Sequence, residues 1–315
     1  MDLFSEESYL EVLQEYFPSQ RGELLVPPGD DCAVFNWESP MCISSDLFIQ
    51  DVHFRLSYFS PEDIGYKSLA INISDISAMG AMPLGFQMNV MLPEWVEEKF
   101  WRSFLQGMST LAREYDLLLL GGDLVKADKL GVSMSILGKS SQRYLQRAAV
   151  SAGDILFLLG DIGLARTGFS VLEQGRESSG FADSVSAHLR PSLHVHAANS
   201  LAAYPSVRGL MDVSDGLMID LPRFLGKKLG AELSLCREDL HAEVLEFAEI
   251  KGVPPESLAL QGGEDYALLG ACSPDEFGQV KQDIPELKKI GQVSTKKGIF
   301  LQGQKLGLQG FDHFG

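Results

Sequence analysis

Residues 60–92 read SPEDIGYKSLAINISDISAMGAMPLGFQMNVML, and this stretch predicts a buried helix at the centre of an α/β unit. Ser60 is in the position of an N-cap, Pro61 suits the first helical position, and Asp63 is placed to complete a capping box. Apolar residues then cover nearly every side of the helix over 64–79. A helix that is apolar all round is typical of a protein interior.

Strands and helices alternate on both sides of this helix, which indicates an α/β or α+β fold. Apolar runs predict strands at 32–36, 41–49, 84–92, 117–120, 131–138 and 155–159, a strand and turn over 258–265, and helices over 1–20 and 94–115. The pattern becomes polar and basic between Ser140 and Gly153. We therefore predict two domains, 1–148 and 149–315.

The composition narrows the possible functions. The chain has 315 residues, of which 45% are hydrophobic, and its net charge is −17. A surface with this much negative charge repels phosphate backbones and anionic lipids. We therefore expect neither nucleic acid nor a membrane as a partner. The first residues do not resemble a signal peptide, and no apolar run reaches the ~20 residues that span a bilayer. Four scattered cysteines suit a reducing compartment, so we expect a cytoplasmic protein.

Acidic residues recur where apolar segments end. The pattern appears in ISSD (43–46), INISD (71–75), LLLLGGD (117–123), MDVSD (211–215) and LALQGGED (258–265), and an acidic pair, Asp30-Asp31, follows Pro-Gly. Any one instance is explained by a turn, because Asp and Ser cap turns and Gly adopts positive φ. Six instances favour a shared site.

Asp75 is the strongest indication of such a site, because it lies within the predicted buried helix. An unpaired buried carboxylate is costly, so we expect a salt bridge to Lys67 or Arg55, or a metal ion. Two carboxylates 4 Å apart repel by roughly 4 kcal/mol at an effective dielectric constant near 20. Oxygen ligands without clustered His or Cys favour Mg²⁺. Since Mg²⁺ commonly shares substrate phosphates, an ATP-dependent enzyme is expected, although the P-loop and protein-kinase motifs are absent.

Eight motifs, in this order along the chain, resemble those of the thiamine-monophosphate kinase family. They are PGDDCAVF (28–35), SSDLFIQDVHF (44–54), GYKSLAINISDISAMGAMPLGF (65–86), LLGGDL (119–124), QRAAVSAGD (146–154), DVSDGLMIDL (212–221), GGEDYALL (262–269) and GFDHFG (310–315). They span nearly the whole chain. Departures are modest: Leu124 stands where the family usually has Thr, and Ala267 where it usually has Glu.

The resemblance implies a two-domain fold like that of aminoimidazole-ribonucleotide synthetase, with the N-terminal domain completing a β-barrel across a homodimer. It implies phosphorylation of thiamine monophosphate by ATP to give thiamine diphosphate, with several Mg²⁺ ions. The family's metal ligands fall on Asp30, Ser44, Ser45, Asp46, Asp75, Asp123, Asp212 and Asp215. Its ATP contacts fall on Tyr115, Gly122, Asp123, Arg147 and Ser214, and its substrate contacts on His53, Glu264 and Phe311.

The chemistry implied in this way needs no general base, because the attacking phosphate oxygen is already largely anionic at neutral pH. Charge repulsion between two phosphates is then the main barrier, and divalent cations would offset it. Two other functions stay open: another ATP-dependent enzyme of the superfamily, such as a cyclo-ligase, and a non-catalytic acidic protein that binds divalent ions.

Overall fold

The chain has a mixed α/β fold and divides into two compact units, Met1–Ile76 with Met82–Ser141, and Ser77–Ala81 with Gln142–Gly315. The structure, a computed structural model, describes residues 12–13, 15–17, 24–26, 34–35, 40–140, 143–175 and 180–307.

The first unit is built on a four-stranded sheet with the order β3-β6-β4-β5. Three strands, β3 (Met41–Ile49), β6 (Gly131–Lys139) and β4 (Met82–Leu92), pair antiparallel, whereas β5 (Leu118–Lys126) runs parallel to β4. A separate antiparallel pair joins β1 (Leu24–Val26) to β2 (Val34–Phe35).

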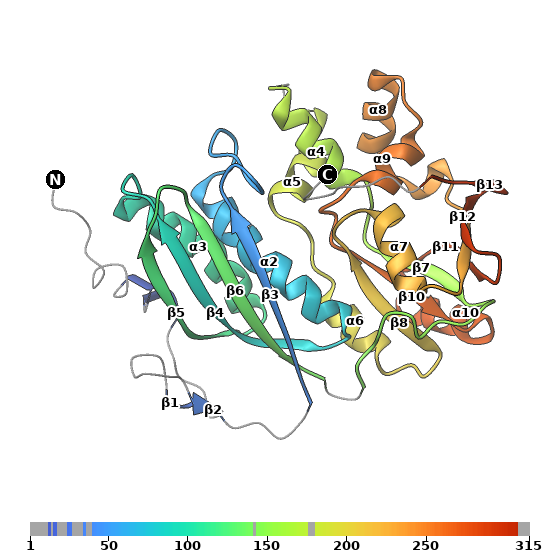
Figure 1. Ribbon diagram of the computed structural model, residues 1–315, viewed down its shortest axis with the longest axis horizontal. Coiled ribbons are helices and arrows are strands. Elements are labelled where there is room, and N and C mark those ends of the chain that lie inside the picture. The colour runs from blue at the N-terminus through green and yellow to red at the C-terminus, as the bar shows by residue number, and fades with distance from the viewer. Residues whose placement is uncertain are drawn as a thin grey trace. The chain divides into compact units, whose positions relative to one another are not determined.

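Two helices, α2 (Pro61–Ala78) and α3 (Glu98–Glu114), cover one face of this sheet (Figure 1). The predicted capping box at the start of α2 is confirmed. The Asp63 amide donates to the Ser60 hydroxyl at 3.2 Å, and the Ser60 amide donates to the Asp63 carboxylate at 3.1 Å. Most of α2 is buried, as its apolar sequence predicted.

Two glycines let the backbones of α2 and α3 approach closely. A Cβ atom on Gly65 would lie 1.8 Å from the carbonyl oxygen of Phe104, and one on Gly107 would lie 1.9 Å from that of Glu62. Both distances are far below van der Waals contact, so any side chain at either position would force the helices apart.

The strand predicted at 117–120 is longer in the structure, because β5 continues through the Gly121-Gly122-Asp123 motif to Lys126. Gly121 and Gly122 have φ of 137° and 153°, and the register against β4 shifts there. A Cβ on Gly122 would lie 1.8 Å from the Met88 carbonyl oxygen. The glycines therefore do not end the strand; they let it continue through an irregularity.

The opposite face of the four-stranded sheet carries exposed apolar side chains. Ile43 and Leu47 of β3 are 73% and 53% exposed, and Val125 of β5 is 53% exposed. The described part of the chain contains no closed barrel; the sheet is open.

The second unit is built on a seven-stranded sheet with the order β13-β12-β9-β11-β7-β10-β8. Neighbouring strands pair antiparallel except β12 and β9, which are parallel. The strands are β7 (Ile155–Leu159), β8 (Val207–Val213), β9 (Gly230–Leu233), β10 (Ala267–Cys272), β11 (Lys288–Ser294), β12 (Gly298–Leu301) and β13 (Gln304–Lys305).

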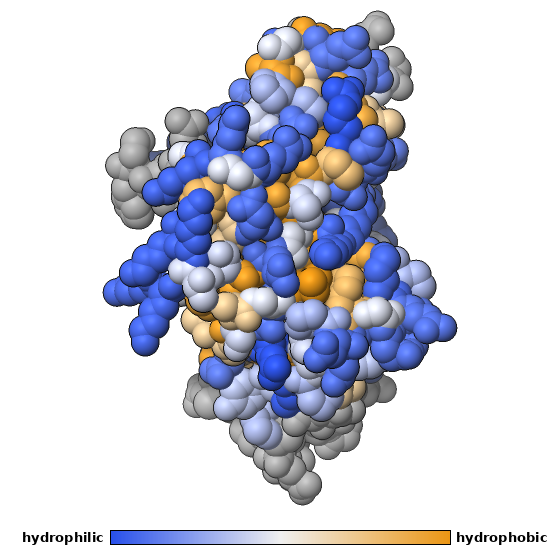
Figure 2. Space-filling model, turned by 90° about the vertical axis from the view of Figure 1, so that its right-hand side faces the viewer, coloured by the Kyte–Doolittle hydropathy of each residue, from blue (hydrophilic) through white to orange (hydrophobic). Residues whose placement is uncertain are grey.

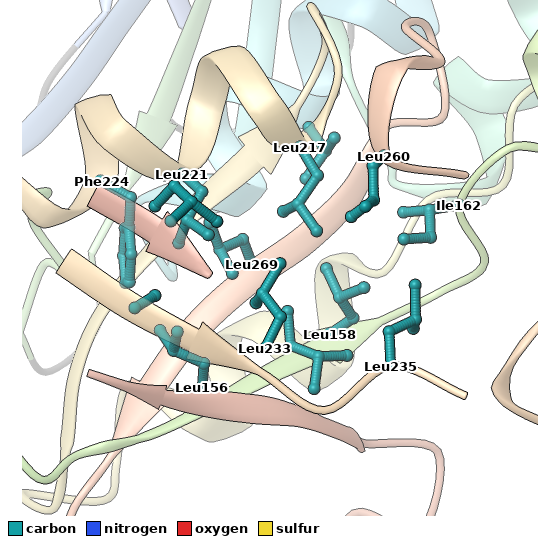
Figure 3. Close-up of a cluster of buried hydrophobic side chains, with 14 of the residues drawn as sticks. Leu156, Leu158, Ile162, Leu217, Leu221, Phe224, Leu233, Leu235, Leu260 and Leu269 are labelled. Atoms are coloured by element: carbon teal, nitrogen blue, oxygen red, sulfur yellow. The ribbon is translucent and has the colours of Figure 1, made fainter. Parts of the chain in front are cut away.

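Helices cover both faces of this sheet. On one face, Leu156 and Leu158 of β7 pack in a core with Leu221 and Phe224 of α7 (Leu217–Leu225), as Figure 3 shows. On the other face, Phe157 shares a core with residues of α6 (Val195–Leu201) and α10 (Pro274–Asp283). The continuous apolar run of β7 is thus explained by burial on both faces.

The remaining helices of this unit are α4 (Leu164–Glu173), α5 (Ala182–Leu189), α8 (Ala242–Lys251), α9 (Pro255–Gln261) and the 3₁₀ turn η2 (Arg237–Asp239). Of the strand and turn predicted over 258–265, the strand is wrong, because Pro255 starts a helix that runs to Gln261 and whose Ala259 and Leu260 join the core. In the described ranges no helix is long and apolar enough to cross a membrane. The face of the molecule shown in Figure 2 is mostly hydrophilic, with small apolar patches.

Candidate active site

Ser44, Asp46 and Asp75 meet between β3 and α2. Ser44 and Asp46 alternate with exposed Ser45 on the strand, so they share the face that the helices cover. The Ser44 hydroxyl donates a hydrogen bond to the Asp75 carboxylate. Burial, followed by the charge and hydrogen bonding of Asp75, raises the pKa of Asp46 to about 6.

This group fits a hard divalent cation by its chemistry. It offers two carboxylates and a hydroxyl, and burial together with the neighbouring Asp75 carboxylate raises the pKa of Asp46. In the described ranges, no group of three or more His, Cys, Asp or Glu side chains is placed to hold a metal ion. Mg²⁺ is commonly bound through one or two protein carboxylates, with waters and phosphates as its other ligands, and the Asp46–Asp75 pair has that composition.

His53 lies in the turn that follows β3. Its Nδ1 accepts a hydrogen bond from the Ile49 amide at 3.0 Å, and its ring stacks on Phe48 with centroids 5.9 Å apart. Accepting at Nδ1 places the ring proton of neutral His53 on Nε2. The ring is therefore oriented with Nε2 as a donor, as contact with a phosphate would require.

Three further predicted residues of the first unit, Ser45, Asp123 and Tyr115, have contacts of their own. Ser45 points to the opposite face of β3 and donates to the Met134 carbonyl oxygen at 2.7 Å. Asp123 is exposed, pairs with Asn89 of β4 and accepts from the Leu124 amide at 3.0 Å. Tyr115 ends α3, and burial, with a hydrogen bond to Glu114, raises the pKa of its hydroxyl.

In the second unit, two predicted motifs lie side by side. The amide of Glu264 donates to the Ser214 carbonyl oxygen at 2.7 Å, and the amide of Tyr266 donates to that of Val213 at 3.0 Å. A Cβ on Gly263 would lie 2.8 Å from the Ser214 carbonyl oxygen. The loop after β8 and the loop before β10 therefore form one surface at the same edge of the sheet.

Asp215 is engaged by a basic residue that the sequence analysis missed. Arg223 of α7 binds both Asp215 and Asp220, the latter at 3.0 Å. The carboxylate of Asp220 also accepts from the Asp215 amide at 2.9 Å, and burial raises the pKa of Asp220 to about 6. The sequence did contain a sign of this contact. Asp220 lies in an apolar helix, as Asp75 does, and therefore needs a partner such as Arg223.

The remaining predicted residues divide by exposure. Asp212 is 4% exposed on β8, opposite Leu268 of β10. Arg147 is exposed on a turn, next to Ala148, whose φ is 57°. Asp30 and Phe311 lie outside the described residues.

The class of protein follows from similarity to known families and solved structures. Residues 29–140 match the family model described as AIR synthase related protein, N-terminal domain. The chain is similar over 96% of its length to a solved thiamine-monophosphate kinase of Stenotrophomonas maltophilia K279a, with 25% identity, 98% coverage of that chain and a TM-score of 0.83. A structure described as AaThiL complexed with AMPPCP and TMP matches the whole chain and 98% of its own, with 26% identity and a TM-score of 0.79.

The thiamine-monophosphate kinase of Bacillus subtilis (strain 168) is 33% identical over 308 residues, which cover 91% of this chain and 92% of that protein. The chain belongs to the thiamine-monophosphate kinase family.

Proposed function

We propose that this chain transfers the γ-phosphoryl group of ATP to thiamine monophosphate and so forms thiamine diphosphate and ADP. The main support is its full-length membership of a family whose relatives carry that activity in their names. A solved relative is described as a complex with AMPPCP and TMP, an ATP analogue with the substrate. The acidic group of the first unit fits this chemistry.

The transfer is direct. An anionic phosphate oxygen of thiamine monophosphate attacks the γ-phosphorus of ATP, the bond from that phosphorus to the β–γ bridging oxygen breaks, and ADP leaves with the electron pair. No residue has to remove a proton from the nucleophile. What the protein supplies is placement and charge compensation.

The acidic residues divide this work. Ser44, Asp46 and Asp75 would hold one Mg²⁺ ion. The other proposed metal ligands, which would serve further Mg²⁺ ions, are Asp30, Ser45, Asp123, Asp212 and Asp215. A bound Mg²⁺ ion supplies positive charge to the transferring phosphates. Ser44 orients Asp75 through its hydrogen bond, and His53 offers Nε2 to the phosphate of thiamine monophosphate.

The nucleotide and the ring of the substrate meet other residues. Tyr115, Gly122, Asp123, Arg147 and Ser214 would contact ATP. Glu264 and Phe311 would contact the cationic thiazolium ring, the first through charge and the second through its aromatic face. The proposal keeps two domains, 1–148 and 149–315.

The proposed dimer explains the uncovered face of the four-stranded sheet. Ile43, Leu47 and Val125 present apolar surface there, and a second copy of the same sheet would cover it and close a barrel.

One incubation tests the proposed function. The purified protein, ATP, Mg²⁺ and thiamine monophosphate should yield thiamine diphosphate by mass spectrometry. ADP release without thiamine diphosphate would instead indicate another reaction of the superfamily, and metal binding without ADP release would indicate an ion-binding protein. Rapid quench with γ-labelled ATP alone should leave no label on the protein; a labelled phosphoenzyme would refute direct transfer.

A further inference from the structure

Glu264 has a backbone fixed on both sides. Its φ is 64°, in the left-handed region that few non-glycine residues adopt. Its amide donates to the Ser214 carbonyl oxygen at 2.7 Å. The next residue, Asp265, accepts from the amides of Gly163 and Ala165 at 2.7 and 3.0 Å, which ties this loop to the start of α4.

A buried histidine contacts the side chain of Glu264. Nδ1 of His188 lies 3.2 Å from Oε2 of Glu264, and the two side chains are 2% and 32% exposed. The carboxylate thus contacts a buried ring while keeping part of its surface open to a ligand.

His188 is itself fixed by packing. It lies in α5, and the ring of Phe169 from α4 packs edge-on against it, with centroids 5.5 Å apart and an angle of 60° between the planes. The guanidinium of Arg166 lies over the same Phe169 ring, 5.5 Å from its centroid. The imidazole therefore has little freedom to turn away from Glu264.

A glutamate on a loop has several rotamers, and a ligand that needs one of them must bear the entropic cost of selecting it. A buried partner that selects the rotamer beforehand removes that cost and preorganises the site. From this arrangement we infer that His188 is a positioning residue, which holds the Glu264 carboxylate toward the cationic ring of the substrate. The inference rests on the proposed function, in which Glu264 meets that ring.

The test compares two substitutions at one position. His188→Leu fills the space without a polar atom, whereas His188→Asn puts an amide nitrogen where Nδ1 was. We expect His188→Leu to raise KM for thiamine monophosphate about ten-fold, with kcat and KM for ATP nearly unchanged. The reason is that the lost contact stabilises bound thiamine monophosphate equally in the ground state and in the transition state. His188→Asn should restore most of the affinity.

Ser184→Ala is the matched control, because Ser184 is fully buried one turn earlier in the same helix. It should leave all three constants unchanged. Equal losses in Ser184→Ala and His188→Leu, or a fall in kcat or in ATP affinity with His188→Leu, would show that α5 acts only through the fold and would overturn the inference.

A measurement without substrate separates this inference from the proposed function. The ring ¹⁵N resonances of His188 should shift between the wild-type protein and Glu264→Gln, because the neighbouring charge is removed. Unchanged resonances would refute the contact. Failure of the wild-type protein to form thiamine diphosphate would instead refute the proposed function, and the NMR comparison would still decide whether His188 holds Glu264.

Discussion

At the scale of single residues, Asp46 and Asp75 show how far a sequence argument reaches. An acid inside an apolar helix must find a partner, and the structure gives Asp75 a hydroxyl from Ser44 and a second carboxylate from Asp46. The sequence indicates that Asp75 needs a partner but does not identify it, because β3 and α2 are brought together only by folding.

Asp46→Asn should lower the turnover strongly while stabilising the metal-free protein. The pKa of Asp46 is raised to about 6 in the folded state, so the folded chain holds that proton more tightly than the unfolded chain. The stability gained from the proton is complete below the unfolded-state pKa and is lost as the pH rises through about 6.

We therefore expect the variant to exceed the metal-free wild type by up to about 3 kcal/mol in unfolding free energy near pH 7.5, and by much less near pH 4. Its turnover should fall by about a hundred-fold or more. Denaturant melts at both pH values and a steady-state assay measure this. The control is Asp128→Asn, because Asp128 is exposed. If Asp46→Asn and the wild type were equally stable near pH 7.5, the raised pKa of Asp46 in the folded state would be contradicted.

At the scale of elements, helices and buried strands were predictable where one residue pattern dominated. β7 has the predicted bounds of 155–159, and α2 begins one residue after its predicted cap. The prediction missed where glycines continue a strand, as in β5, and where a helix is short, as in α9. Both outcomes depend on neighbours: β4 accepts the irregular backbone of β5, and the core buries Ala259 and Leu260 of α9.

Gly107→Ala should separate α2 from α3. The added Cβ would meet the Glu62 backbone at 1.9 Å, and backbone cannot move aside as a side-chain end can. Overpacking of this kind costs about 1–3 kcal/mol. Thermal unfolding should show a lower Tm. Gly278→Ala is matched to it, because Gly278 lies in α10 with nothing within 4 Å of its added Cβ; there we expect no loss, and an equal loss would contradict the explanation.

Asp265→Ala should weaken the start of α4. The substitution leaves the amides of Gly163 and Ala165 without their carboxylate acceptor. A buried donor left unsatisfied costs about 1–3 kcal/mol. Hydrogen exchange at these two amides should accelerate relative to amides in the middle of α4. Unchanged protection would show that the loop does not depend on Asp265.

At the scale of the whole molecule, the exposed face of the four-stranded sheet predicts self-association. Ile43→Glu places a charge on the apolar face, and charge on such a surface opposes pairing with a second copy. Analytical ultracentrifugation should show a dimer for the wild-type protein and a monomer for the variant. Ile250→Glu is the matched control, because Ile250 is 50% exposed at the end of α8 in the other unit. A wild-type monomer, or a dimer that survives Ile43→Glu, would refute the proposed interface.

The place of β7 in its sheet constrains the order in which the chain can fold. β7 ends at Leu159, yet both of its edges pair with strands near the C-terminus, β10 at residues 267–272 and β11 at residues 288–294. During synthesis the most apolar strand of the second unit is therefore made long before either partner exists. Pairings so distant in sequence form slowly, and bare strand edges invite association with other chains. Nascent chains that stall between β8 and β10 should accordingly depend most on chaperones.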